Sequence, residues 1–362
     1  MGPLKGLKII EVSGIGPGPF CGMLLADLGA DLVCVDRSEP PVLDPATDCM
    51  RRGKRSIILD LKSPQDSETL LAMVEKADVL FEGFRPGVME KLGLGPDECM
   101  ARNPRLVYGR MTGWGQFGPL AQAAGHDINY ISLCGALHAI GPKDGKPVPP
   151  LSLVGDFAGG SLLLALGLVS AILETQKSGR GQVIDAAMSD GSALVTAIFH
   201  SLKAQGQWRT ERGSNLLDGG APFYQAYETQ DGKHISIGPI EPQFFAVLLD
   251  KTGLDAEEFG PQNDVSRWPD QQRRLEVVFK TRSRDEWCEI LEGSDACFAP
   301  VLDFNEAPRH PHNRARDAYI EVGGMTQPAP APRFSRTAQE VAHAARRPGT
   351  DRAGVLKDWG IA

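Results

Sequence analysis

Three side chains of this sequence have the chemistry needed to move a proton on and off a weakly acidic carbon. His126 lies in a polar cluster inside an apolar region, Asp156 lies just ahead of an apolar run, and Glu241 precedes a proline. General acid–base catalysis uses such groups, because a neutral imidazole is a base near pH 7 and a buried carboxyl can stay protonated. Sequence spacing alone does not show that the three residues meet.

Each of these residues also has a structural interpretation. Asp156 and Glu241 stand at predicted helix starts, where a carboxylate accepts backbone N–H groups and faces the positive end of the helix dipole. His126 could equally be a structural histidine of its polar cluster. Capping and packing therefore compete with catalysis until other observations separate them.

Basic residues gather between positions 37 and 91 of an otherwise acidic chain, several of them just beyond predicted strand ends. They are Arg37, Arg51, Arg52, Lys54, Arg55, Lys62, Arg85 and Lys91. Ligands of an open α/β sheet bind outside the carboxyl ends of its strands. Arg and Lys side chains at that edge suit a phosphorylated small ligand. A solvated run of charges is the alternative.

A glycine-rich turn at residues 14–19 (GIGPGP) follows the first predicted strand, and Asp36 comes about twenty residues later. A dinucleotide-binding fingerprint has this arrangement, but Pro19 occupies its third glycine position. The motif therefore indicates a tight turn rather than an NAD site.

Short β-branched runs alternate with apolar-periodic stretches through the first half of the chain. Strands are predicted at residues 7–13, 31–36, 56–61, 79–81, 106–111 and 181–186, and helices at 64–77 and 191–202. The apolar run at 161–173 is predicted to be a buried core helix. This βαβ alternation predicts a parallel sheet in a doubly wound, Rossmann-like α/β domain.

The pattern changes to that of a small α+β domain near residue 226. Asp231-Gly232 between runs at 227–230 and 233–237 predicts a β-hairpin, whereas the prolines and glycines of 308–332 predict an extended return segment. The predicted domains are a large one at 1–190 completed by 330–362, a linker helix and connection at 191–225, a small one at 226–310 and a return linker at 311–329.

Composition narrows the classes of partner. The 362 residues include 38 Lys+Arg and 46 Asp+Glu, a net charge of −8, which argues against nucleic acid and anionic membranes. The run at 161–173 is shorter than the roughly 20 residues of a bilayer crossing. No secretory or peroxisomal signal is recognised, so a cytoplasmic protein is expected. Seven scattered cysteines without C-x-x-C spacing predict neither disulfides nor a metal site.

Several motifs resemble those of the family III CoA-transferase superfamily, and especially its 2-methylacyl-CoA racemases. They lie at residues 84–87 (FRPG), 110–115 (RMTGWG), 125–130 (GHDINY), 149–151 (PPL), 154–157 (VGDF), 185–188 (DAAM), 331–335 (APRFS) and 358–360 (DWG). The resemblance implies the fold of that superfamily, a Rossmann-like large domain plus a smaller α+β domain in an interlocked homodimer.

The resemblance also implies an activity. The chain would be a racemase that inverts the α-carbon of 2-methylacyl-CoA thioesters by two-base proton transfer through an enolate, with His126 and Asp156 as the two bases. Glu241 would orient His126 across the subunit interface. Asp127 would brace Asp156, and backbone N–H groups at the helix start around Asp156 would hold the enolate oxygen. No metal or redox cofactor is expected, since coenzyme A is part of the substrate.

Two other functions stay open. A family III CoA-transferase would use Asp156 as a nucleophile, although the transferases generally lack the histidine of the Gly-His-Asp motif, which favours the racemase. A non-catalytic acyl-CoA binder would use His126, Asp156 and Glu241 only for packing and capping.

The same resemblance places the CoA and thioester site along one set of residues of the large domain. They are Arg37, Leu59, Asp60, Leu61, Lys62, Gly83, Phe84, Arg85, Lys91, Gly125, Asn129 and Tyr130. The CoA phosphates would then be the ligand of the basic cluster. The expected partners are an acyl-CoA thioester and a second copy of the chain, with no nucleic acid and no membrane.

Overall fold

The computed structural model describes residues 2–39 and 43–361, and its largest element is a six-stranded parallel sheet. The strand order is β3-β2-β1-β4-β5-β6, that of a doubly wound α/β sheet. The strands are β1 (Lys8–Val12), β2 (Asp31–Asp36), β3 (Arg55–Ile58), β4 (Val79–Glu82), β5 (Val107–Thr112) and β6 (Val183–Ala187). The predicted parallel α/β sheet is therefore confirmed, with small shifts at the strand ends.

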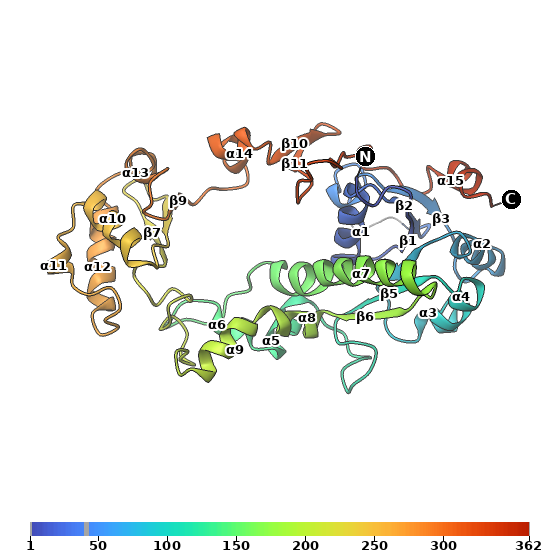
Figure 1. Cartoon of the computed structure of the whole chain (residues 1–362), viewed down its shortest axis with the longest axis horizontal. Helices are drawn as coiled ribbons and strands as arrows, with labels where there is room; N and C mark the ends of the chain where they lie inside the picture. The colour runs from blue at the N-terminus through green and yellow to red at the C-terminus, as the bar shows by residue number, and fades with distance from the viewer. Residues whose placement is uncertain (1, 40–42, 362) are drawn as a thin grey trace. The chain divides into compact units, whose positions relative to one another are not determined.

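The helices of this part of the chain cover both faces of the sheet (Figure 1). They are α1 (Pro17–Asp27), α2 (Pro64–Val74), α3 (Val88–Lys91), α4 (Pro96–Arg102), α5 (Asp127–Leu133), α7 (Leu163–Ser178), α8 (Met188–Val195) and α15 (Arg352–Trp359), with a 3-10 turn η1 (Cys49–Arg51) and a π-helix η2 (Leu153–Leu162). Helices α2, α4 and α15 pack on one face, and α1 and α7 pack on the other.

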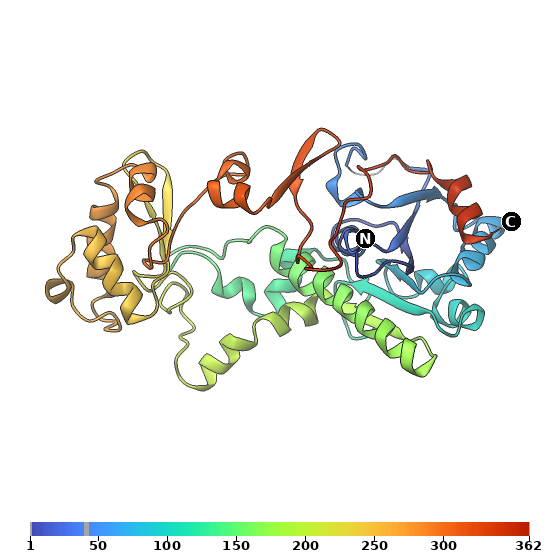
Figure 2. The same cartoon turned by 45° about the horizontal axis from the view of Figure 1, so that its top comes forward.

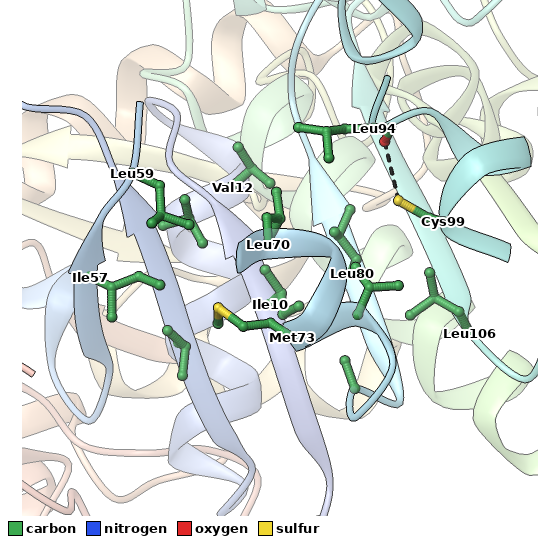
Figure 3. Close-up of a cluster of buried hydrophobic side chains, with 14 of the residues drawn as sticks. Ile10, Val12, Ile57, Leu59, Leu70, Met73, Leu80, Leu94, Cys99 and Leu106 are labelled. Carbon is green, nitrogen blue, oxygen red and sulfur yellow. Dashed lines mark hydrogen bonds between the residues drawn. The ribbon is translucent and has the colours of Figure 1, made fainter. Parts of the chain in front are cut away.

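Successive strand residues enter two separate hydrophobic cores, because side chains alternate across a strand. Ile10 belongs to the core under α2, where Leu70 and Met73 lie over the sheet (Figure 3). Ile9 belongs to the opposite core, under α1 and α7. A sheet buried on both faces has continuously apolar strands, and the centre of β2, residues 32–35 (LVCV), has this property.

The chain divides into two compact units. The first contains residues 1–136, 150–196 and 317–362, and the second contains 137–149 and 197–316. The second unit is built on an antiparallel sheet of β7 (Gln225–Glu228), β8 (His234–Ile237) and β9 (Phe298–Pro300). The predicted hairpin around Asp231-Gly232 is confirmed as β7 and β8.

The second unit also contains several short helices. They are α9 (Ala197–Ala204), α10 (Pro242–Thr252), α11 (Ala256–Phe259), α12 (Trp268–Phe279), α13 (Arg284–Leu291), η3 (Ala307–Arg309) and α14 (Pro311–Ala315), and α6 (Ala136–Ala139) lies at the boundary between the units. Aromatic side chains form much of the core, and Phe223, Phe259 and Phe279 are fully buried.

The predicted core helix differs from expectation in length and burial. The π-helix η2 continues into α7, so one helical segment runs over 26 residues, Leu153–Ser178. Among the described residues this segment alone is long and apolar enough to cross a bilayer, and 39% of its most apolar window is buried. Leu166 and Leu173 are 62% and 55% exposed. The prediction of a buried helix is right for the face on the sheet and wrong for the outer face.

The predicted extended return segment is also wrong in part. It contains α14 and an antiparallel hairpin of β10 (Tyr319–Val322) and β11 (Met325–Pro328). Gly323 and Gly324 both have positive φ, which a two-residue hairpin turn requires. Beyond this hairpin the chain returns to the sheet, where α15 lies beside β3 (Figure 2) and Trp359 Nε1 donates to Asp31 at 2.8 Å.

Candidate active site

A cavity of about 660 Å³ opens at the carboxyl ends of β1, β2, β4 and β5. Its wall consists of residues 12–18, 81–85, 111–114 and 123–126, together with single residues such as Asp156 and Met188. All of them belong to the first unit. An open parallel sheet binds its ligands at this edge, so the cavity is the candidate site.

His126 is held at the edge of this cavity by the start of α5. It is the N-cap residue of the helix, and its ring is exposed. Its backbone N–H donates to Asn129 Oδ1 at 3.0 Å, while its carbonyl accepts the N–H of Asn129 at 2.8 Å. The hydroxyl of Tyr130 donates to the carbonyl of Gly125. The backbone of His126 and that of the preceding residue, Gly125, are therefore fixed by the first turn of α5.

Asp156 does not cap its helix, contrary to the interpretation from the sequence. The helix begins at Leu153, with Ser152 as the N-cap residue, so Asp156 lies inside the first turn of η2. The start was predicted too late because glycines at 155, 159 and 160 resemble a loop. The carboxyl lies beside the glycine loop, since a Cβ built on Gly16 would be 3.4 Å from Asp156 Oδ2.

The surroundings of Asp156 favour its protonated form. Burial, and after it the neighbouring Asp127 carboxylate, raise the pKa of Asp156 from its ordinary 3.8 to a net value of about 6. His126 and a hydrogen bond from Ser152 act in the opposite direction. The net shift brings the pKa of Asp156 close to neutral pH, so the carboxyl can serve as either an acid or a base.

Asp127 links the two predicted bases, because it follows His126 and contacts Asp156. It is 5% exposed, and its Oδ2 accepts the backbone N–H of Asp156 at 2.8 Å. Among the described residues its Oδ1 has no hydrogen-bond partner. This contact occupies the backbone N–H of Asp156, which is one of the N–H groups around the helix start that were predicted to hold the enolate oxygen, so Asp156 itself is not a donor for that oxygen.

Close packing fixes the π-helix against its neighbours. The buried hydroxyl of Ser161 lies 2.7 Å from the carbonyl of Pro17 and 3.0 Å from that of Asp156. On the side facing α8, a Cβ on Gly191 would lie 1.8 Å from the carbonyl oxygen of Gly159. Only glycine fits at position 191, and the backbone that carries Asp156 is held from two sides.

Glu241 belongs to the second unit, as the N-cap residue of α10. Its side chain is exposed and makes no capping hydrogen bond within the described part of the chain. The capping interpretation is therefore wrong for Glu241. Its predicted contact with His126 stays a prediction.

The predicted CoA-site residues fall into two groups. Those that line the cavity are Arg37, Gly83, Phe84, Arg85, Gly125 and Tyr130. Outside its wall, Leu59 and Leu61 pack in or against the core, and Asp60, Lys62, Lys91 and Asn129 are exposed. The Arg37 guanidinium lies over the Phe84 ring, 5.2 Å from its centroid, and so holds two strand ends together.

Half of the basic cluster is not available to a ligand. Arg51, Arg52 and Lys54 are buried and form ion pairs of 2.5, 2.6 and 2.5 Å with Asp36, Asp27 and Glu11. Arg55 is paired with Asp31 at 2.6 Å. Both the phosphate-binding and the solvated interpretations are wrong for Arg51, Arg52 and Lys54, because their charges are neutralised inside the fold. Arg55 is part-buried and pairs with two carboxylates, Asp31 and Asp358, that are partly exposed.

Several residues of the cavity wall had no role in the site predicted from the sequence. Glu82, Thr112 and Asp36 are the last residues of β4, β5 and β2, and Trp114 and Met188 lie nearby in the wall. The carboxyl-end rule could have found the three strand-end residues, but it was applied only to basic side chains. Met188 comes to the cavity through tertiary packing, which spacing does not reveal.

Comparison with known proteins defines the family of this fold. The model of CoA-transferase family III matches residues 4–352. The chain belongs to CoA-transferase family III. A family III protein of Brucella suis, described as a CAIB/BAIF family protein, has a crystal structure that superposes with a TM-score of 0.85 at 26% identity, over 99% of both chains.

Two curated relatives of this family III chain are much closer in sequence. The mouse protein named alpha-methylacyl-CoA racemase is 46% identical over 99% of this chain and 93% of its own length. The human protein of that name is 44% identical over 92% and 87%. A human succinyl-CoA:glutarate CoA-transferase is 28% identical over 98% of this chain and 86% of its own.

Proposed function

We propose that this family III chain is a racemase of 2-methylacyl-CoA thioesters. The observation that carries the proposal is that one cavity holds both the imidazole of His126 and the carboxyl of Asp156, whose pKa is raised to about 6. The two racemase relatives, at 46% and 44% identity, support the same activity. Inversion needs a base on one face of a carbon and an acid on the other, and these two groups supply both.

The proposed reaction has two proton transfers. The neutral imidazole of His126 removes the α-proton of the (S) substrate, and the C–H electron pair forms an enolate with the thioester carbonyl. Protonated Asp156 then gives its proton to the opposite face, which leaves the (R) thioester, an imidazolium and a carboxylate. In the reverse direction Asp156 is the base and His126 the acid. No electrons leave the substrate, so the mechanism uses no redox cofactor.

The proposed donor for the enolate oxygen lies at the start of α1, next to Asp156. Pro17 and Pro19 have no N–H, and Phe20 donates to the carbonyl of Gly16. Gly18 therefore supplies the first-turn N–H, in the wall of the cavity and at the positive end of the helix dipole. A backbone donor placed there stabilises the charge that develops in the transition state.

The proposed CoA site uses the basic side chains at the cavity that form no ion pair with the described residues. Arg37 and Arg85 line its wall. Guanidinium groups bind phosphate oxygens through paired hydrogen bonds, so these two residues are the anchors for the CoA phosphates. Lys62 and Lys91 are exposed outside the wall.

We also propose that the chain is a homodimer, on the basis of the exposed face of its long helix. Leu162, Leu166 and Leu173 are 49%, 62% and 55% exposed, a degree of apolar exposure that marks an association surface. Light scattering during size-exclusion chromatography is expected to give twice the chain mass without detergent, and Leu166→Glu is expected to shift the species to the monomer. A wild-type monomer would contradict the proposal.

Asp127→Asn tests how the acid is tuned. Asparagine keeps an acceptor for the N–H of Asp156 but removes the charge that raises the pKa of Asp156. The pKa of Asp156 then falls, less of it is protonated at pH 7, and (S)-to-(R) inversion is expected to slow about threefold and to recover at lower pH. Asp78→Asn is the control, because Asp78 accepts the N–H of Lys8 at the other end of the strands. If the pH profiles of inversion by the wild type and by Asp127→Asn were identical, Asp127 would not tune the acid.

The transferase is the second candidate, favoured by the CoA-transferase relatives at 28–32% identity. In that reaction the Asp156 carboxylate attacks the thioester carbonyl and expels CoA thiolate, which leaves an acyl–aspartyl anhydride. The thiolate then attacks the aspartyl carbonyl, the acyl group leaves as a free carboxylate, and the resulting aspartyl-CoA thioester is the species that hydroxylamine traps. Incubation of one enantiomer of a 2-methylacyl-CoA, with and without a carboxylate acceptor, separates the functions. We expect inversion by chiral analysis without an acceptor and no trapped enzyme. Trapping of the aspartyl-CoA enzyme and CoA transfer without inversion would establish the transferase. Binding of the acyl-CoA without either reaction would establish a non-catalytic acyl-CoA binder.

A further inference from the structure

The mechanism leaves unused a buried carboxyl in the wall of the cavity. Glu82 is the last residue of β4, is 2% exposed and lines the cavity together with Gly83, Phe84 and Arg85. Its Oε2 accepts the backbone N–H of Phe84 at 2.7 Å. The Glu82 side chain therefore folds back on the loop that follows its own strand and fixes the first turn of that loop.

The other carboxylate oxygen of Glu82 is held by the neighbouring strand. Arg110 of β5 pairs in register with Glu82, and its Nε lies 3.3 Å from Glu82 Oε1. The same guanidinium reaches Glu90 of α3 at 2.8 Å. Arg110 thus joins the strand end before residues 83–87 to the helix that follows them, and both ends of this loop are tied to one side chain.

The loop itself presents groups suited to an anionic ligand. Arg85 lines the cavity, and the Phe84 ring lies under the Arg37 guanidinium. Gln122 donates to the carbonyl of Pro86 at 3.0 Å from the other side. Movement of the Phe84 backbone would therefore displace both guanidinium groups of the cavity wall. Arg85 would move because it follows Phe84 in the chain, and Arg37 because it stacks on the Phe84 ring.

We propose that Glu82 is a positioning residue that holds the loop at residues 83–85 in the shape that binds the phosphates of CoA. The proposal rests on the proposed function only in taking CoA as the ligand of this cavity. It requires neither racemase nor transferase chemistry. Glu82 acts through the N–H of Phe84 and through Arg110, and does not touch the reacting carbon.

Ionisation of Glu82 adds a signature that simple packing would lack. Burial raises the pKa of Glu82 from 4.5 to about 7, with an increase from Glu90 and decreases from the Phe84 N–H and Arg110. The other ionisable groups on the adjoining strands are Tyr108 on β5, whose pKa is itself raised, Glu11 on β1, in register with Phe81, and Lys8 at the start of β1. As pH falls through 7, Glu82 gains a proton and its bonds to Phe84 and Arg110 weaken.

The test measures CoA binding by calorimetry for the wild type, Glu82→Gln and a matched control. The control is Glu75→Gln, because Arg102 bridges Glu68 and Glu75 on the surface just as Arg110 bridges Glu90 and Glu82. At pH 8 we expect Glu82→Gln to raise the Kd for CoA about tenfold, the equivalent of about 1.4 kcal/mol, and Glu75→Gln to leave it unchanged. An unchanged Kd in Glu82→Gln would overturn the proposal.

A second measurement uses the wild type alone and covers the case in which Glu82→Gln does not fold. Dephospho-CoA lacks the phosphate monoester that titrates near pH 6, so its own charge is constant. We expect its Kd to rise as pH falls from 8 to 6. Protonation of Asp156 or Glu82 makes the cavity more positive and would by charge alone tighten binding of an anion, so a constant or falling Kd overturns the proposal.

The two proposals fail separately. If the wild type binds neither CoA nor dephospho-CoA, the CoA site of the proposed function is wrong and the role of Glu82 fails with it. If the wild type binds CoA with the same affinity as Glu82→Gln, only the role of Glu82 fails.

Discussion

Replacing His126 with alanine is expected to lower kcat for inversion by about 10²–10⁴-fold in both directions, the range typical of a lost general acid–base group. The (S) substrate then has no base on its α-proton face, and the (R) substrate has no acid on the opposite face. The Kd for CoA is expected to change little, because the phosphate anchors lie on residues 37 and 83–85. The rate of inversion of each pure enantiomer, followed by chiral analysis, measures the effect.

The same variant makes a second result possible in D2O. Asp156 is intact, so His126→Ala is expected to exchange the α-proton of the (R) substrate without inverting it. His312→Ala is the control, because His312 is exposed on α14 in the second unit. Undiminished inversion by His126→Ala would remove His126 from the mechanism, and exchange of the (S) substrate instead would reverse the assignment of faces.

Asp156→Asn is expected to lower kcat for inversion about 10³-fold, since asparagine matches the shape of the carboxyl but cannot donate or accept the proton. The π-helix is expected to persist, because its fixing contacts use the backbone of Asp156 and the side chain of Ser161. In D2O the variant is expected to exchange the α-proton of the (S) substrate through His126, without inversion. Proton exchange followed by mass spectrometry measures this half-reaction.

Asp97→Asn is the matched control for Asp156→Asn, because Asp97 also lies in the first turn of a helix and is exposed outside the cavity. Its activity is expected to equal that of the wild type. If Asp156→Asn retains full inversion, Asp156 is not the second base. If Asp156→Asn loses both inversion and exchange of the (S) substrate, the two bases do not act independently on the two faces.

The sheet could be predicted from the sequence because its strands are buried on both faces. Runs such as residues 32–35 (LVCV) are apolar throughout, and the cores above and below the sheet require this. The hairpin around Asp231-Gly232 was found through its turn residues, whereas the similar signal of Gly323-Gly324 was missed because the surrounding prolines suggested an extended linker. Local turn chemistry was present in both cases.

The start of the π-helix could not be predicted from local propensity. Glycines at 155, 159 and 160 normally interrupt a helix. Here the carbonyl of Gly159 lies where a Cβ on Gly191 would be, and a Cβ on Gly155 would be 2.4 Å from Asp127 Oδ2. Tertiary contacts with α8 and α5 therefore explain these glycines, and the sequence offers no sign of those partners.

Charge pairing was equally hidden from the sequence. Lys54 and Glu11 are 43 residues apart in the chain yet lie 2.5 Å apart in the core, so composition could not tell a buried pair from a phosphate ligand. For the site, the family resemblance implied that His126 and Asp156 act together, and the structure has both in the wall of one cavity. The raised pKa of Asp156 depends on burial and on Asp127, which only the folded chain reveals.

The most direct test of the central claim follows one enantiomer of a 2-methylacyl-CoA with the wild-type protein in D2O. Configuration is read by chiral analysis and α-deuterium by mass spectrometry, at early times. We predict that the (R) product formed from (S) substrate carries one α-deuterium in nearly every molecule, since Asp156 takes its proton from solvent between turnovers. Neither inversion nor exchange, or inverted product without deuterium, would contradict proton transfer between His126 and Asp156.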